Sequence, residues 1–233
     1  MSTPQLPLRL ARPPRAGLED FLPADAPALS LLRDWLAGGR GNLLLRGPAG
    51  CGKSHLLLGA LERIAARGEQ AGYLPLAALG TRADAMVEAQ PALPWVAVDD
   101  LDEALIDPAL QRALFALHNR VGDQGGRMLY ASRGNPGDWT SLLPDLRSRL
   151  GQSVQALLQP LDEAQRREWF TRRAAALGMQ LDEASLEYLF RRVGRDLPGL
   201  QRLLDRLDVD SLAAQRRLTV PFLRDFLAAG ESD

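Results

Sequence analysis

Residues 47–54 read Gly-Pro-Ala-Gly-Cys-Gly-Lys-Ser and match the phosphate-binding pattern G-x-x-x-x-G-K-[ST]. Glycines let several backbone N–H groups converge on a polyanionic phosphate, because they adopt dihedral angles that other residues avoid. The positive N-terminal end of a following helix adds to this attraction. We expect the Lys53 ammonium to reach the β- and γ-phosphates and the Ser54 hydroxyl to bind Mg²⁺. The predicted nucleotide-binding residues are Gly47, Pro48, Ala49, Gly50, Cys51, Gly52, Lys53, Ser54 and His55.

A second motif is acidic and follows the apolar residues 95–98, where Asp99 and Asp100 stand next to each other. An apolar strand that ends in acidic residues is typical of the Walker B motif of nucleoside triphosphatases. We predict that Asp99 holds Mg²⁺ and that Asp100 orients or deprotonates the attacking water. Asp100 is shorter than the Glu found there in many ATPases, so rapid ATP turnover by this chain stays an open question.

Apolar periodicity predicts alternating strands and helices around both motifs, and therefore a parallel sheet covered by helices. Each candidate polar residue stands at or just beyond the carboxyl end of a strand, which is where ligands bind in open α/β sheets. The expected strands are 42–45, 72–76, 95–98 and 127–132, and the expected helices are 29–36, about 14 residues from Ser54, and 108–121.

Three regions are expected along the chain. Residues 1–17 are rich in Pro and Arg and lack periodicity, which indicates an extended tail. Residues 18–158 hold both motifs and form the predicted α/β domain. After Pro160 the strand patterns stop and apolar residues recur at helical spacing, so residues 159–233 are expected to form a small all-helical domain.

Composition excludes several classes of protein. The chain has 233 residues, 46% of them hydrophobic, which suits one α/β domain with a helical appendage. A net charge of −1 excludes a general electrostatic attraction for nucleic acid. The single cysteine excludes a disulfide framework and a multi-cysteine zinc site. Because no long apolar run is present, we expect a cytoplasmic protein without contact with a membrane.

Four segments resemble the AAA+ ATPases of the DnaA branch. Within this branch they resemble the short regulators that are homologous to the replication initiator DnaA. These segments are 52–57 (GKSHLL), 72–76 (GYLPL), 143–150 (LPDLRSRL) and 214–222 (AQRRLTVPF). The resemblance covers nearly the whole chain. It implies an AAA+ P-loop domain with a C-terminal helical lid and bound ADP or ATP with Mg²⁺. Whether copies of the chain associate through their AAA+ surfaces stays an open question.

The same resemblance implies roles for individual residues. Arg149 occupies the arginine-finger position and would act in trans on the nucleotide of a neighbouring AAA+ protein. Arg195 matches the sensor 2 position, which touches the nucleotide of its own chain. Phe21 and Leu22 lie in a segment that resembles the stretch packing on adenine. The sensor 1 region falls on residues 132–133, where the acidic residue of the family is absent.

The tail contains Gln5-Leu6-Pro7-Leu8-Arg9-Leu10, which resembles peptides that bind the sliding clamp of bacterial DNA polymerase. Gln5 would form hydrogen bonds in a polar pocket, while Leu6, Leu8 and Leu10 would fill an apolar groove. Pro7 extends the backbone in advance, so that less entropy is lost on docking.

The function implied by the resemblance is that of a clamp-tethered AAA+ regulator in the replisome. It would stimulate hydrolysis of the ATP bound to the replication initiator DnaA, and it would contact DNA only indirectly. Two alternatives stay open. Steady ATP turnover by the chain alone would favour a self-sufficient AAA+ ATPase or helicase loader, and salt-sensitive binding to duplex DNA without clamp would favour a DNA-binding module.

Overall fold

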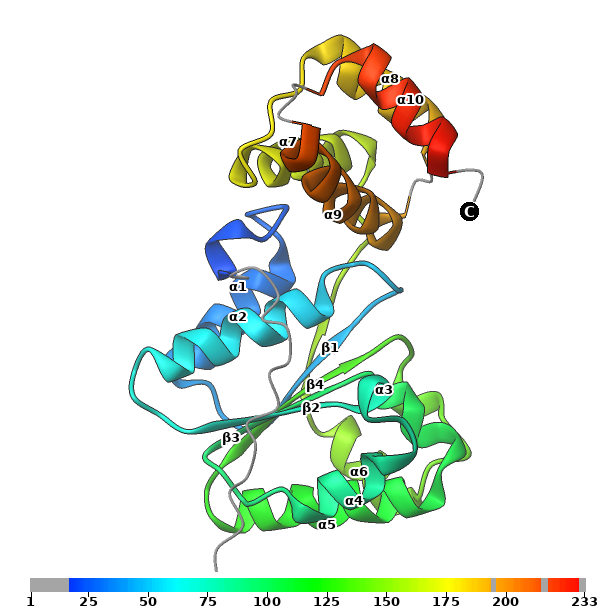
Figure 1. Ribbon diagram of the computed structural model, residues 1–233. Helices are drawn as coiled ribbons and strands as arrows, with labels where there is room; N and C mark the ends of the chain where they lie inside the picture. The colour runs from blue at the N-terminus through cyan, green and yellow to red at the C-terminus, as the bar shows by residue number, and fades with distance from the viewer. Residues whose placement is uncertain (1–16, 194–195, 215–217, 231–233) are drawn as a thin grey trace, which may run out of the picture. The chain divides into compact units, whose positions relative to one another are not determined.

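The computed structural model describes residues 17–193, 196–214 and 218–230 of the chain (Figure 1). It divides into two compact units. The first unit comprises Met1–Pro48 and Gly52–Leu158, and the second comprises Ala49–Cys51 and Gln159–Asp233.

A five-stranded sheet forms the centre of the first unit, and all four of its strand pairings are parallel. The strands are β1 (Leu43–Arg46), β2 (Ala71–Pro75), β3 (Trp95–Asp99), β4 (Arg127–Ser132) and β5 (Val154–Leu157), in the order β2-β3-β4-β1-β5. The predicted parallel sheet is confirmed. The sequence did not indicate β5, because this short edge strand buries only Ala156 and therefore lacks an apolar run.

Helices cover both faces of this sheet (Figure 1). One face carries α1 (Pro27–Gly38) and α2 (Lys53–Ala65), and the other carries α4 (Ala83–Ala89), α5 (Pro108–Asp123) and α6 (Pro144–Gly151). Shorter helical segments connect these elements: η1 (Leu18–Asp20), α3 (Leu76–Leu79), η2 (Gly80–Arg82), η3 (Leu101–Ile106) and η4 (Pro136–Asp138).

Helix α5 illustrates how local signals set these boundaries. The Asp107 carboxylate accepts hydrogen bonds from the N–H groups of Ala109 and Leu110, at 2.8 and 3.1 Å, and Pro108 occupies the first turn. Both features favour a helix start. Leu114 and neighbouring apolar residues of α5 pack into the core below the sheet. The predicted helix from residue 108 is therefore confirmed.

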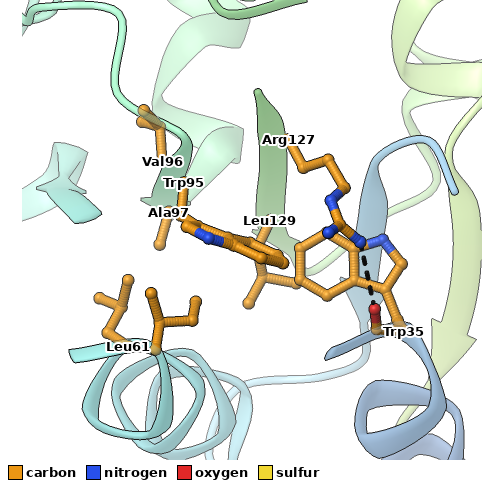
Figure 2. Close-up of a pocket in the computed structure, with 8 residues that line it drawn as sticks. Trp35, Leu61, Trp95, Val96, Ala97, Arg127 and Leu129 are labelled. Atoms are coloured by element: carbon orange, nitrogen blue, oxygen red, sulfur yellow. Dashed lines mark hydrogen bonds between the residues drawn. The ribbon is translucent and has the colours of Figure 1, made fainter. Parts of the chain in front are cut away.

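Two tryptophans and an arginine pack together where β3 and β4 begin, and Figure 2 shows this pocket. The rings of Trp35 and Trp95 meet edge to face with their centroids 5.2 Å apart. The Arg127 guanidinium lies 4.2 Å from the centroid of the Trp95 ring and donates a 2.5 Å hydrogen bond to the Gly39 carbonyl. Packed side chains thus cover the amino-terminal ends of β3 and β4, opposite to the carboxyl ends at which the candidate site lies.

The second unit consists of helices α7 (Glu163–Ala176), α8 (Glu183–Arg192), α9 (Leu197–Ala214) and α10 (Val220–Gly230). Asp162 and Gln165 form a capping box at the start of α7. Phe170, Leu189, Leu204 and other apolar side chains of these helices form a separate core. The predicted helical domain is confirmed. No helix in the described part of the chain is long and apolar enough to cross a membrane.

Candidate functional site

The loop between β1 and α2 holds the predicted phosphate-binding residues. Gly50 and Gly52 adopt φ angles of 75° and 92°, a left-handed region that side chains with a Cβ atom disfavour. The Lys53 ammonium donates hydrogen bonds to the carbonyl oxygens of Gly47 and Pro48, at 2.6 and 2.8 Å. Lys53 is therefore held inside the curve of the loop, where it is 8% exposed.

The segment that precedes α1 lies against the phosphate loop. A Cβ atom built on Gly52 would come within 2.6 Å of the Phe21 ring, so the ring packs directly on the loop backbone. The Phe21 ring also meets the His55 ring, with 5.8 Å between centroids, and His55 Nε2 lies 3.0 Å from the Gly17 carbonyl oxygen. Phe21 and Leu22 are buried. Their predicted contact with adenine stays a prediction, as does a direct role for His55.

The predicted magnesium ligand Asp99 ends β3 and is 2% exposed. Its two carboxylate oxygens each accept a hydrogen bond. The Tyr73 hydroxyl, from β2, donates to Oδ2 at 3.1 Å, and the Asp100 N–H donates to Oδ1 at 2.9 Å. Burial and the adjacent Asp99 raise the pKa of Tyr73, so its phenol stays protonated and remains a donor.

Asp100 has φ 54° and ψ 46° and is the only described residue other than glycine with a positive φ. This left-handed conformation is uncommon for residues with a Cβ atom and is often found at functional sites. Burial and the Asp99 charge raise the pKa of the Asp100 carboxyl above its ordinary value. A carboxylate made more basic in this way is better suited to accept a proton from water.

The loops that follow β3 and β4 are joined by a residue that the sequence did not single out. Asp102, in η3, accepts hydrogen bonds from the backbone N–H groups of Arg133 and Gly134, at 2.8 and 3.3 Å. Ser132 is buried, and its hydroxyl donates to the Gly134 carbonyl. The predicted sensor 1 region is therefore held in place by Asp102. Only its negative charge could have suggested this role, and the sequence has many acidic residues.

The groups gathered at the carboxyl edge of the sheet fit a magnesium nucleotide. Loop N–H groups and an ammonium bind phosphate oxygens, and a hydroxyl and carboxylates are the oxygen ligands that Mg²⁺ prefers. Ser54 is exposed in the first turn of α2 and is available for such a bond. β4 lies between β1 and β3 in the sheet, so the two motifs, distant in sequence, come to the same edge.

Arg149 lies in the last turn of α6 and is exposed. Within the described residues, no hydrogen bond or ion pair involves its guanidinium. Arg133, by contrast, lies 3.9 Å from Glu103, and Arg63 lies 3.4 Å from Glu19. The described part of the chain therefore leaves the donors of Arg149 available to another molecule.

His118, in α5, has a pKa that depends on its burial and on the charge of Arg149. Its Nδ1 atom lies 2.7 Å from the Tyr130 hydroxyl, which in turn contacts the Met128 sulfur at 2.9 Å. Burial lowers the pKa of His118, and the positive charge of Arg149 lowers it further. His118 is therefore neutral in the folded protein at neutral pH.

We expect the wild-type protein to lose stability as the pH falls from about 7.5 to about 5.5. When the pH falls below the ordinary pKa of histidine, His118 takes up a proton in the unfolded chain. In the folded chain its lowered pKa keeps it neutral, so the free energy of unfolding falls. The loss is at most about 1.4 kcal/mol per pH unit. In urea unfolding at several pH values, the free energy of unfolding of His118→Gln should fall less steeply with pH than that of wild type. An equal dependence on pH in both proteins would contradict this assignment. In NMR titrations, Arg149→Ala should raise the pKa of His118.

Several predicted residues lie outside the described part of the chain. These are the clamp-binding residues Gln5, Leu6, Leu8 and Leu10 and the sensor 2 residue Arg195. The structure does bring together Lys53, Asp99 and Asp100 at one sheet edge, with Tyr73 and Asp102 as partners that the sequence analysis missed.

Comparison with known proteins agrees with the two-unit architecture. Residues 162–227 match the family model described as the lid domain of Hda. Domain III of the replication initiation protein DnaA from Thermotoga maritima is similar in structure, with a TM-score of 0.74 and 19% identity, over 90% of this chain and 94% of that one.

Two further solved structures share the fold. AMPPCP-bound DnaA from Aquifex aeolicus has a TM-score of 0.65 and 17% identity, over 87% of this chain and 69% of that one. A RuvB mutant from Thermotoga maritima has a TM-score of 0.66 and 18% identity, over 94% and 74%. The predicted AAA+ fold with a helical lid is confirmed. Residues 162–227 are therefore an Hda-type lid domain, and the chain has the fold of DnaA domain III.

Proposed function

We propose that this chain is a replication regulator that binds an adenine nucleotide with Mg²⁺ and supplies Arg149 to the active site of the initiator DnaA. The observation that carries the proposal is the exposed guanidinium of Arg149, which has no hydrogen bond or ion pair within the described residues. The Hda-type lid domain and the DnaA-like fold support a DnaA-related role in replication.

The chain's own nucleotide, ADP or ATP, binds at the carboxyl edge of the sheet. Lys53 and the loop N–H groups hold the phosphates, and Ser54 and Asp99 hold Mg²⁺, which neutralises phosphate charge when bound. Phe21 and Leu22 pack near the base, and Arg195 takes the sensor 2 role that the resemblance implies. The AMPPCP bound to DnaA from Aquifex aeolicus supports adenine as the base. Bound nucleotide orders the surface through which AAA+ proteins, including further copies of this chain, associate.

Arg149 acts on the partner rather than on its own nucleotide. A planar guanidinium offers five N–H donors and a permanent positive charge, which suits the oxygens of a transferring phosphoryl group. Negative charge grows on these oxygens and on the leaving group during cleavage, and the guanidinium stabilises it. In GTPases such an arginine accelerates hydrolysis by about 10³- to 10⁵-fold.

The N-terminal tail tethers the regulator to the sliding clamp on DNA through Gln5, Leu6, Leu8 and Leu10. Tethering raises the local concentration of the regulator near the initiator without any new contact between them. It also makes stimulation strongest at DNA that carries a loaded clamp. The protein therefore works in the cytoplasm, at the replisome.

The test measures ATP remaining on purified initiator after this chain is added with or without DNA-loaded clamp. We expect the clamp to increase stimulation about 10²-fold or more, the gain typical of a tethered second contact. Gln5→Ala should lose most of this gain, because the polar anchor of the tail is gone. It should keep the basal stimulation seen without clamp. Equal stimulation by wild type and Gln5→Ala on loaded clamp would reject the tether.

A self-sufficient AAA+ ATPase is the second candidate, favoured by the left-handed Asp100 with its raised pKa. It predicts steady ATP turnover by the purified chain without initiator, and Asp100→Asn should abolish that turnover. Under the leading proposal, Asp100→Asn leaves stimulation of the initiator intact, since hydrolysis takes place on the partner.

A further inference from the structure

We infer that Tyr73 is a positioning residue for the magnesium site, holding the Asp99 carboxylate in the orientation that the ion requires. This inference rests on the proposed nucleotide site and assigns a function to a residue outside both sequence motifs. It starts from one contact, the 3.1 Å hydrogen bond from the Tyr73 hydroxyl to Asp99 Oδ2.

The pairing of β2 with β3 explains why Tyr73 reaches Asp99. Pro75 stands opposite Asp99, and Tyr73 stands opposite Ala97, two residues earlier on β3. Side chains two residues apart on a strand point to the same face, so Tyr73 and Asp99 share a face of the sheet. Ala97 lines a pocket with Leu61 of α2, so this is the face covered by the phosphate-loop helix.

Two donors from different elements fix the Asp99 carboxylate. The Asp100 N–H holds Oδ1 and the Tyr73 hydroxyl holds Oδ2, at 2.9 and 3.1 Å. One donor alone would leave the group able to rotate about its Cβ–Cγ bond. Each carboxylate oxygen has two acceptor positions, so both oxygens keep one for Mg²⁺ or its water.

This restraint matters because Mg²⁺ demands near-ideal octahedral geometry. A ligand that is already oriented loses less freedom when the ion binds. Removing a partner that orients a metal ligand typically lowers metal affinity by about 10- to 100-fold. Tyr73 has the same relation to Asp99. Removing its hydroxyl is expected to weaken the binding of Mg²⁺ and to leave the phosphate contacts made by Lys53 unchanged.

The experiment uses Tyr73→Phe, which keeps the ring and removes only the hydroxyl. ADP binding is measured by isothermal titration, first in excess EDTA and then at increasing Mg²⁺. We expect a half-saturating Mg²⁺ concentration about tenfold higher than in wild type. The affinity for ADP in EDTA should be unchanged, because the phosphate loop is intact. Mn²⁺ binding in the presence of ADP, followed by electron paramagnetic resonance, should weaken to the same degree.

Tyr130→Phe is the matched control. It also removes a phenol hydroxyl from a strand of the sheet, but Tyr130 is buried in β4 and contacts His118 and Met128 instead of Asp99. We expect Tyr130→Phe to lower stability and to leave the Mg²⁺ midpoint unchanged. A wild-type midpoint in Tyr73→Phe, or an equal shift in both variants, would overturn the inference. Absence of ADP binding by the wild-type protein would instead reject the proposed nucleotide site itself.

Discussion

Arg149→Ala should abolish the stimulation of ATP hydrolysis on the initiator, with a loss of about 10³-fold or more in the stimulated rate. The substitution removes the guanidinium that stabilises the growing charge of the transition state, and alanine offers no donor in its place. The measurement is single-turnover hydrolysis of labelled ATP bound to initiator, with the variant in excess on DNA-loaded clamp.

The structure separates this effect from a loss of folding. Arg149 is exposed and has no described hydrogen bond or ion pair, so its removal should change the free energy of unfolding by less than about 0.5 kcal/mol. Clamp binding and ADP binding should be those of wild type. Arg147→Ala is the matched control, because Arg147 lies on the same helix two residues earlier. Normal stimulation by Arg149→Ala, or an equal loss in Arg147→Ala, would reject the assigned finger.

Lys53→Met should lower the affinity for ADP and ATP by roughly 100-fold. A hydrogen bond to a charged group contributes about 1.5–3 kcal/mol, and each 1.4 kcal/mol corresponds to about a tenfold change in affinity. The ammonium is expected to exchange its present partners, the carbonyls of Gly47 and Pro48, for phosphate oxygens. Isothermal titration with ADP measures the change, and urea unfolding checks the fold.

Arg63→Met provides the control for charge alone, because Arg63 lies on the same helix at the protein surface. We expect nucleotide affinity to be unchanged in this variant.

Lys53 is also the only lysine in the sequence. An amine-acylating reagent can therefore modify only this side chain and the N-terminal amine. Bound nucleotide should protect Lys53, and labelling at an equal rate with and without ADP would contradict a phosphate contact.

The proposed regulator and its alternative differ in where hydrolysis happens. Lys53→Met should weaken stimulation only as far as bound nucleotide orders the AAA+ surface, so a high concentration of ADP should restore part of it. A self-sufficient ATPase would lose turnover in Lys53→Met and keep it in Arg149→Ala. These two variants together therefore distinguish the candidate functions.

The sequence predicted the elements whose signals are local. The phosphate loop needs glycine at fixed positions, and α5 begins where Asp107 and Pro108 favour a helix start. The buried strands β3 and β4 are continuous apolar runs, which mark strands covered on both faces. Strand β5 and helices α3 and α4 escaped prediction, because their short and partly exposed stretches carry little periodicity.

The sequence by itself determined the nucleotide motifs, the α/β class with a helical lid, and the identity of the residues able to do chemistry. Only the tertiary structure decided their partners. The bond between Tyr73 and Asp99 depends on the register of β2 against β3. The bonds of Asp102 join loops about 30 residues apart. Such contacts arise from strand order and packing between distant segments, which local spacing does not encode.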